Sequence, residues 1–227
     1  MFRANKQSLY TLIIAIFITV LITSNIASAK LFSLLGSGII IDGGTILFPF
    51  AYIIGDIVTE VYGFKKAKHL IYIGFIMSIL TSITLYVVQI LPPAVGWNNQ
   101  DAYIAILGAL PRIITGSLCA YLIGEILNSY VMARLKVITN GKYLWVRTIG
   151  STLVGALVDT TIFSFIAFYG TIPDQSLVML IATVYTIKVS VEVIVTPITY
   201  KIIRHLKNVE GVDHFDRNLN IMNALKG

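Results

Sequence analysis

Long apolar runs with short connections between them constrain this chain more than any other feature of its sequence. Six such runs occupy about 9–29, 44–63, 69–91, 104–131, 146–170 and 178–204. A membrane-spanning helix needs about 20 mostly apolar residues, so the six runs nearly fill the 227 residues. Only 12% of the residues are charged, about half the share usual in a soluble domain. We therefore expect an all-α integral membrane protein, with six transmembrane helices in one domain over 1–227 and a short tail at 205–227.

Turn-forming residues mark the ends of these runs. Pro92 and Pro93 end the third run, and the segment from Thr139 to Lys142 separates the fourth from the fifth. Gly170–Asp174 predicts a very tight last hairpin, and Leu34–Gly44 holds four of the 17 glycines. These residues mark the boundaries between the predicted spans.

The first run also resembles a signal peptide. Arg3 and Lys6 precede it, and Ala27-Ser28-Ala29 at its end matches a small-residue cleavage site. However, the run is as long as a full span, and its removal would leave five spans and an N-terminus outside the cell. We therefore expect this segment to be retained as the first transmembrane helix.

Basic residues collect on one side of the predicted membrane. Of the 17 lysines and arginines, 14 fall on the side of the two termini, and the opposite side has only Lys30. The 14 are Arg3, Lys6, Lys65, Lys66, Lys68, Arg134, Lys136, Lys142, Arg147, Lys201, Arg204, Lys207, Arg217 and Lys226. Because cytoplasmic loops carry the excess of basic residues, we expect both termini in the cytoplasm. Their spread over four separate pieces favours lipid headgroups as their partner and does not indicate nucleic-acid binding.

Seven ionisable residues lie inside the apolar runs, where an isolated charge is costly. They are Asp56, Glu60, Arg112, Glu125, Asp159, Lys188 and Glu192. Each costs at least about 2.5–3.5 kcal/mol at the centre of a transmembrane helix. A chain that only had to sit in the membrane would not carry seven, so they predict a polar cavity or path among the helices.

Helical spacing predicts which of these residues face one another. Three stripes recur every three or four residues: Tyr52, Asp56, Glu60; Thr152, Gly155, Asp159, Phe163; and Tyr185, Lys188, Glu192, Thr196. By position along their runs, Asp56, Arg112, Asp159 and Lys188 fall near the middle of the membrane. The remaining three acids fall closer to the cytoplasm. Four helices therefore bring ionisable groups to one level.

Structural roles are the alternatives to a binding site. Lys188 and Glu192 can neutralise each other along one helix, and Glu60 and Glu125 can extend to the cytoplasmic headgroups. Arg112 can pair with Asp159 or Asp56 without meeting a ligand. Phe48 and Tyr52 can be core residues as readily as a stacking surface beside Asp56.

The excess of acids over bases indicates the chemistry of a ligand. Such a cavity suits a molecule with several N–H donors, a cationic molecule, or coupling to protons or sodium. No H-E-x-x-H, G-x-S-x-G or P-loop motif is present, and the three histidines, His69, His205 and His214, are far apart in the sequence. We therefore predict neither an enzyme, nor a metal centre, nor a bound cofactor.

Three blocks of the sequence resemble one known family. The segment from Asp42 to Gly63, with its F-P-F-A-Y and G-D-I-V-T-E-V-Y-G elements, closely resembles the signature of the queuosine precursor transporters, in the vitamin uptake transporter superfamily. The block Arg147–Thr152, continuing to Asp159, Thr160 and Phe163, is similar to the family's fifth-span motif. Asp213-His214-Phe215-Asp216 is similar to its short cytoplasmic tail. At Asn220–Ala224 the chain departs from the Asn-Pro-Phe type of ending expected for the family.

The resemblance implies a transporter with a bound substrate at mid-membrane. It implies six helices related to the substrate-binding components of energy-coupling-factor importers, in a bacterial cytoplasmic (inner) membrane. It also implies a 7-deazaguanine cargo (7-cyano-7-deazaguanine, 7-aminomethyl-7-deazaguanine or queuine) that is salvaged for queuosine in tRNA. The alternative is a substrate-capture subunit, for a related vitamin or nucleobase, that needs a separate ATPase. Small residues such as Gly116, Cys119 and Ala120 also permit a homodimer.

With such a cargo, the candidate residues take separate roles. Asp56 and Asp159 would accept hydrogen bonds from the base edge, and Glu60 and Glu192 would line the inner path. Lys188 and Arg112 would compensate charge and contact the carbonyl group, which Asn25 is also suited to do. Tyr52, Phe48 and Phe163 would stack on the ring.

Overall fold

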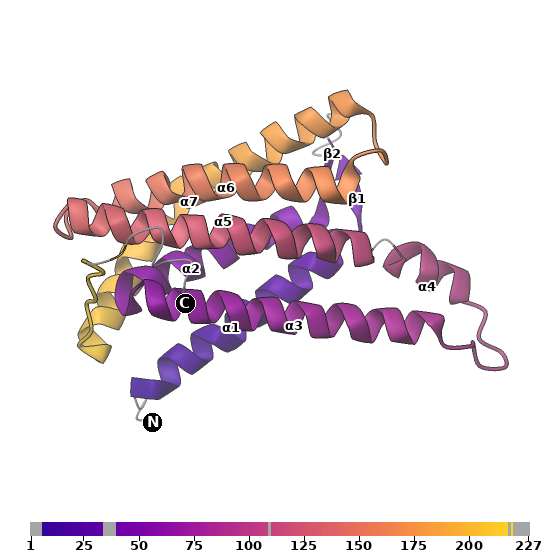
Figure 1. The fold of residues 1–227 in the computed structure, drawn as a ribbon, viewed down its shortest axis with the longest axis horizontal. Helices are drawn as coiled ribbons and strands as arrows, with labels where there is room; N and C mark the ends of the chain where they lie inside the picture. The colour runs from indigo at the N-terminus through magenta and orange to yellow at the C-terminus, as the bar shows by residue number, and fades with distance from the viewer. Residues whose placement is uncertain (1–5, 34–39, 109, 218, 220–227) are drawn as a thin grey trace.

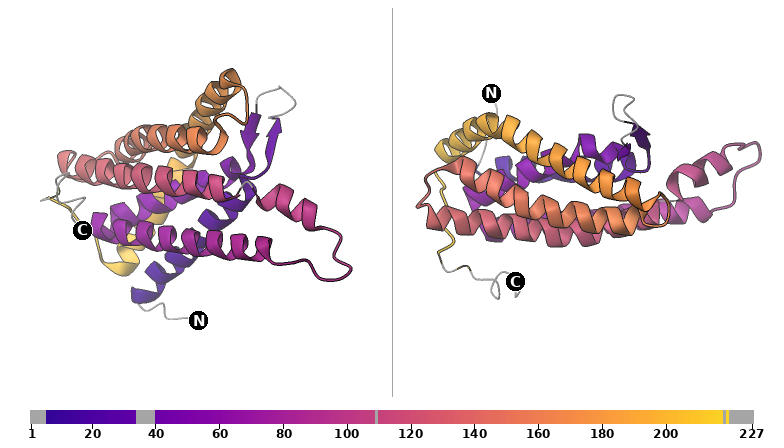
Figure 2. Two further views of the ribbon diagram at one scale, coloured as in Figure 1. Left: turned by 45° about the vertical axis from the view of Figure 1, so that its right-hand side comes forward. Right: turned by 90° about the horizontal axis from the view of Figure 1, so that it is seen from above.

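A computed structural model describes residues 6–33, 40–108, 110–217 and 219 (Figure 1). The elements in chain order are α1 (Lys6–Ala27), β1 (Leu31–Ser33), β2 (Ile40–Asp42), the 3-10 helix η2 (Gly43–Ile46), α2 (Phe48–Tyr62), α3 (Phe64–Ile90), α4 (Gln100–Leu107), α5 (Leu110–Ile138), α6 (Leu144–Phe168) and α7 (Asp174–Glu210). Apart from the antiparallel pair β1–β2, the described fold is helical. The short helix α4 and the turn before it extend beyond the rest of the bundle (Figures 1 and 2).

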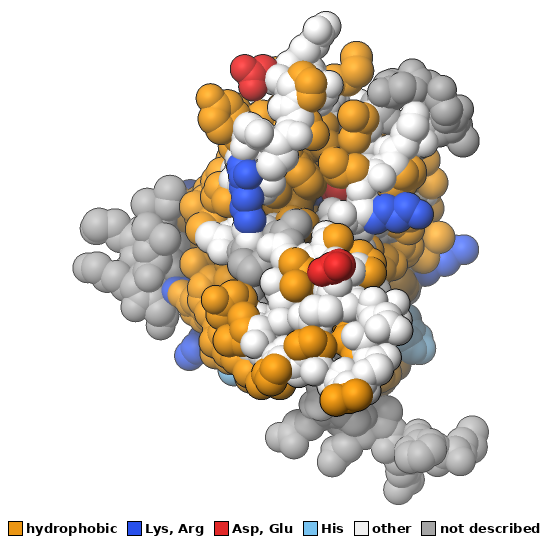
Figure 3. Space-filling view, turned by 90° about the vertical axis from the view of Figure 1, so that its right-hand side faces the viewer, with side chains coloured by type: hydrophobic (Ala, Val, Ile, Leu, Met, Phe, Trp, Pro, Cys, Tyr) orange, Lys and Arg blue, Asp and Glu red, His pale blue; other side chains and the backbone are white. Residues whose placement is uncertain are grey.

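Five stretches of helix are long and apolar enough to cross a membrane, which confirms an all-α membrane protein. They are Leu9–Ala27, Phe64–Ile90, Gln100–Ile138, Leu144–Phe168 and Asp174–Glu210. Large apolar side chains stay exposed along α3 and α7, for example Ile76, Leu80 and Ile83 on α3 and Ile194 and Ile198 on α7. Seen from the end with α4 and the hairpin, the surface is mainly apolar and has few charged side chains (Figure 3). Such a surface is stable in lipid and not in water.

The second predicted span is shorter than expected. Its helix α2 has 15 residues, about 22 Å, whereas the apolar layer of a bilayer is about 30 Å thick. The polypeptide before it forms the hairpin and η2, where the Asp42 carboxylate accepts hydrogen bonds from the Gly44 amide and from the hydroxyls of Ser28 and Thr45. Twelve of the 15 residues of α2 are buried. This helix can be short because its neighbours in the bundle, rather than lipid, surround it.

Helices α5 and α6 run side by side over most of their length (Figures 1 and 2). Two glycines allow the close approach: a methyl group at Gly124 would meet the Asp159 Cβ, and one at Gly155 would lie 2.6 Å from the Asn128 Cβ. The turn between the helices uses three residues with positive φ, Asn140, Gly141 and Tyr143. This packing places polar residues of α5 beside Asp159 of α6.

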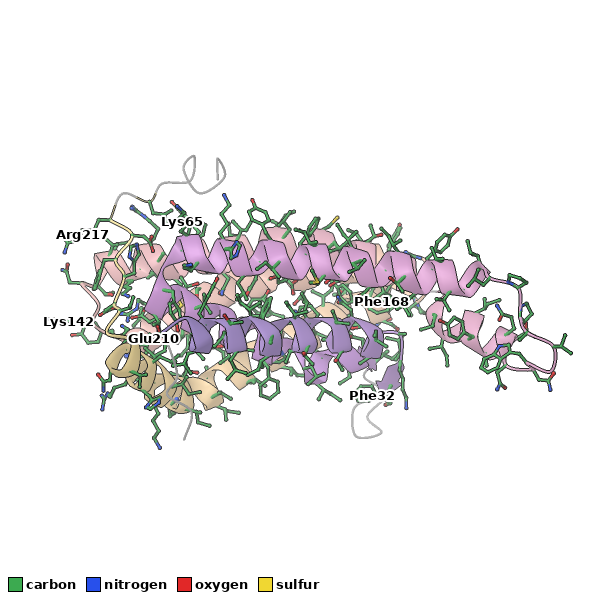
Figure 4. The ribbon with its side chains drawn as sticks, turned by 90° about the horizontal axis from the view of Figure 1, so that it is seen from below. Phe32, Lys65, Lys142, Phe168, Glu210 and Arg217 are labelled. Carbon is green, nitrogen blue, oxygen red and sulfur yellow. The ribbon has the colours of Figure 1, made fainter. Side chains whose placement is uncertain are left out.

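Basic residues gather at one end of the bundle. Figure 4 shows Lys65, Lys142, Glu210 and Arg217 at that end, and Phe32 and Phe168 toward the other. Helix α1 starts, and α7 ends, at the basic end (Figure 1). The loops predicted to share one side of the membrane therefore lie together. Arg3, Lys226, residues 34–39 of the Gly-rich segment Leu34–Gly44, and the ending 220–224 lie outside the described residues.

The small residues that permit a homodimer are used mainly within the chain. A methyl group at Gly116 would contact Ile166 of α6, and Ala120 is fully buried, whereas Cys119 is exposed. This stripe supports the packing of α5 on α6, and a dimer is not shown by the structure.

Candidate functional site

Buried ionisable residues from four helices meet in the middle of the bundle. We call this set the interior cluster: Asp56 of α2, Glu125 and Asn128 of α5, Asp159 of α6, and Lys188 and Glu192 of α7. All six are at least 95% buried. The four carboxylates and Lys188 lie close enough to influence one another electrostatically. The structure thus brings together four of the ionisable residues that the sequence predicted to share one level or path, and adds Glu125 and Asn128.

Lys188 is the cation of this cluster and is fully engaged. Its Nζ lies 2.5 Å from Asp159 Oδ2, and it also lies over the rings of Phe48 and Tyr52, at 4.8 Å and 5.5 Å from their centroids. Among the described residues, no ion pair joins it to Glu192, so the two do not neutralise each other along α7. The ion pair and the two rings form a polar and aromatic surface between α2, α6 and α7.

Several oxygen atoms of the interior cluster have no hydrogen-bond partner. Asp56 Oδ1 accepts from the Asn128 amide at 2.7 Å, whereas Asp56 Oδ2 and Asn128 Oδ1 have none. Both oxygens of Glu125 and Oε1 of Glu192 also lack partners, as does the nearby Thr152 hydroxyl. Because buried polar atoms normally have partners, this group of unpartnered acceptors is a candidate site for a donor-rich ligand. In the described part of the chain, no group of three or more His, Cys, Asp or Glu residues is arranged to hold a metal ion.

A small cavity leads from the hairpin end to Lys188. It is lined by Asp42, Thr45, Phe48, Asp159, Phe163, Val184 and Lys188. Its volume of about 10 Å³ holds roughly one water molecule. Phe163 packs near Phe48, with 6.5 Å between ring centroids, so two of the three predicted stacking rings line this space. A planar ring can enter only if the helices or the hairpin move apart.

A second group of charged side chains, at the basic end, surrounds a buried carboxylate and is fully paired. We call it the Glu60 cluster: Glu60, Lys136, Arg147, Lys207 and Asp213. Arg147 donates to both Glu60 oxygens, at 3.0 and 3.1 Å, and Lys207 Nζ lies 2.6 Å from Oε1. Lys136 Nζ lies 3.4 Å from Oε1 and donates to the Glu60 carbonyl. These contacts join α2, α5, α6 and α7 at the end of the bundle.

The tail motif at 213–216 closes over the Glu60 cluster. Asp213 accepts hydrogen bonds from Lys136 and Lys207, at 2.6 and 2.9 Å, and Phe215 lies under the Lys136 ammonium. Asp216 accepts from the Phe64 amide, at the start of α3. Partial burial raises the pKa of Asp213, but the two lysines outweigh it and hold that pKa below its ordinary value. The tail is therefore fixed to three helices by charge and by main-chain hydrogen bonds.

Three residues predicted for the site lie elsewhere or act differently. Arg112 is exposed and donates to the carbonyls of Ile166 and Tyr169, because the last carbonyls of α6 have no partners within the helix. Asn25 of α1 accepts a hydrogen bond from the Ser117 hydroxyl of α5 at 2.6 Å. Glu60 is paired with three cations, Lys136, Arg147 and Lys207. Neither Glu60 nor Glu125 reaches solvent, since they are 0% and 1% exposed.

The sequence did not single out Asn128, and it named the partners of Glu60 only as basic residues, with Arg147 also part of the block that resembles the family's fifth-span motif. Asn128 follows Glu125 by three residues, so the helical period places both on one face of α5. Lys136, Arg147 and Lys207 were assigned to cytoplasmic loops or helix ends from their charge alone. Their approach to one carboxylate depends on how four helices pack.

Comparison with known proteins identifies the chain's family. The model of the family described as "Putative vitamin uptake transporter" matches residues 42–202, from β2 into α7. The chain belongs to this family. It is accordingly a multi-pass membrane protein of a transporter family and not an enzyme.

Its relatives include proteins named for one kind of cargo. The transporter is 30% identical over 168 residues to a probable queuosine precursor transporter of Bacillus subtilis, covering 74% of this chain and 73% of the relative. It is 32% identical over 126 residues to a queuosine precursor transporter of Escherichia coli, covering 56% and 54%. It is 28% identical over 126 residues to a probable queuosine precursor transporter of Haemophilus influenzae, covering 56% and 51%. No solved structure matches the chain, so the kinship to energy-coupling-factor components stays a prediction.

Proposed function

We propose that this transporter imports a queuosine precursor, a 7-deazaguanine, into the cytoplasm through the interior cluster. The candidates are 7-cyano-7-deazaguanine, 7-aminomethyl-7-deazaguanine and queuine. The relatives named as queuosine precursor transporters support the cargo, and the excess of unpartnered acceptor atoms in the interior cluster supports the site. A deazaguanine carries a ring N–H and an exocyclic amine on one edge, which suits acceptors of this kind.

Each group around Lys188 has a role in this proposal. The ring stacks between the aromatic side chains of Phe48, Tyr52 and Phe163, and the carbonyl of the base accepts from Lys188. Asp159 then gains a donor from the ligand as Lys188 turns toward the carbonyl, and Asp56 offers its free Oδ2. Glu192, on the stripe of α7 below Lys188, lines the continuation of the path.

The basic end faces the cytoplasm in this proposal, so that both termini are inside and the hairpin faces out. The excess of lysine and arginine at that end supports this orientation. Substrate enters at the hairpin, where the small cavity already reaches Lys188, and leaves past the Glu60 cluster and the tail. Cysteine-labelling of single-cysteine variants at Trp97 and Lys142 tests the orientation, with only the first expected to react from outside intact cells.

A binding screen and a reconstitution experiment test the function. Purified protein is examined by calorimetry and thermal shift with guanine, queuine and the two precursors, and at least one 7-deazaguanine should bind more tightly than guanine. Liposomes that contain only this protein should then accumulate the labelled compound. Binding without uptake would instead show a capture subunit that needs an ATPase. The absence of binding to all four compounds would contradict the proposed cargo.

A further inference from the structure

We infer that Glu125 of α5 is the main acceptor for the donor edge of the ligand. This inference rests on the proposed function, because it assigns a residue to the same interior cluster. The ligand class is a flat heterocycle that presents a ring N–H beside an exocyclic amine. Glu125 does not belong to any of the three blocks that resemble the family signature, so the assignment depends on the structure alone.

The position of the Glu125 carboxylate is unusual among the buried acids. It is 1% exposed, and both of its oxygens lack a hydrogen-bond partner. The side chain crosses from α5 toward α2, where Gly55 leaves room for it: a methyl group at Gly55 would collide with Glu125 Oε1. Among the described residues outside its own turn of α2, only Glu125 atoms lie within 4 Å of that methyl position. The fold thus holds a carboxylate without a hydrogen-bond partner directly against the backbone of Gly55.

Three of the other acids inside the spans have partners among the described residues, whereas Glu192 Oε1 has none. Asp159 is paired with Lys188, Asp56 accepts from Asn128 through one oxygen, and Glu60 is bound by three cations. Among the acids of the described spans, Glu125 alone has both oxygens buried without a partner. A ligand that donates to Asp159 Oδ2 competes with Lys188, whereas one that donates to Glu125 displaces no protein partner.

Two free oxygens of one carboxylate match two parallel donors. The ring N–H and exocyclic amine of a guanine-like edge are spaced for such a pair of charge-assisted hydrogen bonds. Neighbouring acceptors, Asp56 Oδ2 and Asn128 Oδ1, add to the preference for donors. Binding at this edge would satisfy atoms that the protein leaves unsatisfied, which favours the ligand over one that lacks the exocyclic amine.

The test compares Glu125→Gln with the unaltered protein by calorimetry. The probes are 7-aminomethyl-7-deazaguanine and its analogue without the exocyclic amine. We expect the unaltered protein to prefer the first probe by about 10- to 100-fold. Glu125→Gln should lose about 10- to 100-fold in affinity for the first probe and most of its preference between the two, because an amide offers a donor where an acceptor is needed.

A second variant alters the site without changing its charge. Gly55→Ala adds a methyl group against the Glu125 carboxylate and should weaken binding of the first probe at least about 5-fold. Gly116→Ala is the matched control, since the atoms nearest to its methyl group belong to Ile166 and Ala167 in the α5–α6 contact, and its affinity should stay unchanged. If Glu125→Gln does not fold, Gly55→Ala still tests whether the Glu125 carboxylate accepts from the ligand.

The outcomes separate this inference from the proposed function. If the unaltered protein binds the probe and both variants bind and discriminate as it does, Glu125 is not the acceptor and the proposed function stands. If the unaltered protein binds neither probe, the proposed cargo is wrong. Loss of affinity in Glu125→Gln without loss of discrimination would show that Glu125 does not receive the exocyclic amine.

Discussion

Two buried glutamates in this bundle have opposite surroundings. Glu60 of α2 and Glu125 of α5 are equally hidden from solvent, yet Glu60 contacts Lys136, Arg147 and Lys207, whereas Glu125 has no hydrogen-bond partner. A buried charge that is fully paired holds helices together. Its removal leaves its partners buried without a counter-charge and so lowers the stability of the fold. A buried acceptor without a partner costs stability, because its desolvation is not offset, and it is free to accept from a ligand. The buried acids of this transporter therefore fall into two groups, those that stabilise the fold and those that are free to accept from a ligand.

The largest expected effect on stability is at Glu60. Glu60→Gln leaves Arg147 buried without its counter-charge and leaves Lys136 with Asp213 alone, which we expect to lower the free energy of unfolding toward the upper end of about 3–5 kcal/mol. Thermal unfolding in detergent measures it. The control is Glu210→Gln, a buried residue at the same end that accepts from the Tyr62 hydroxyl at 3.1 Å, and should change stability by about 1 kcal/mol or less. If Glu60→Gln and Glu210→Gln lowered the free energy of unfolding equally, the three ion pairs of Glu60 would have no special role in stability.

Lys188 should show an effect on stability and on binding together. Lys188→Met leaves Asp159 buried without its cation and should destabilise the protein toward the lower end of about 3–5 kcal/mol. The double variant Lys188→Met with Asp159→Asn should recover most of that stability, because no charge is then left unpaired. Neither variant should bind a 7-deazaguanine. Full recovery of binding in the double variant would show that the ion pair is structural only.

Glu125 should respond in the opposite way to Glu60. Glu125→Gln removes no partner contact, so the free energy of unfolding should stay within about 1 kcal/mol of the unaltered protein. Its binding loss, described above, should therefore occur in a protein of normal stability. Thermal unfolding without ligand and calorimetry with ligand measure the two quantities separately. A loss of several kcal/mol in stability would place Glu125 with Glu60 among the structural acids.

The smallest expected effect is at Asp213 of the tail. Its pKa is lowered in the folded protein, so its stabilising contribution is complete above the ordinary aspartate pKa and is lost as pH falls through the lowered value. Because its side chain is 47% exposed, the effect should be below about 1 kcal/mol. Hydrogen exchange at the His214 amide, which donates to the Val61 carbonyl, reports tail docking. Asp213→Asn should exchange faster than the unaltered protein at pH 7, and an unchanged rate would contradict this role.

Some parts of the site were predictable from helical spacing. Asp56, Asp159, Lys188 and Glu192 were expected to converge because each lies on a polar stripe of an apolar helix, and the structure brings them together. Arg112 was expected there because its position along the run falls near the middle of the membrane. That position does not specify which side of the helix the side chain faces. The unpaired carbonyls at the end of α6 attract it instead. The length of α2 was also overestimated, since an apolar run does not reveal that its first residues, 44–46, form a 3-10 turn after a hairpin.

The sequence by itself determined that this protein lies in a lipid bilayer and is helical. It also determined the number of apolar segments and the side on which basic residues gather. These follow from composition and from the helical period, which act locally along the chain. Only the tertiary structure decided which buried acids are neutralised. Glu60 and Glu125 read alike in the sequence, as acids near the basic end of apolar helices. Their difference arises because three cations from three other helices reach Glu60, while Glu125 faces Gly55 and an open row of acceptors.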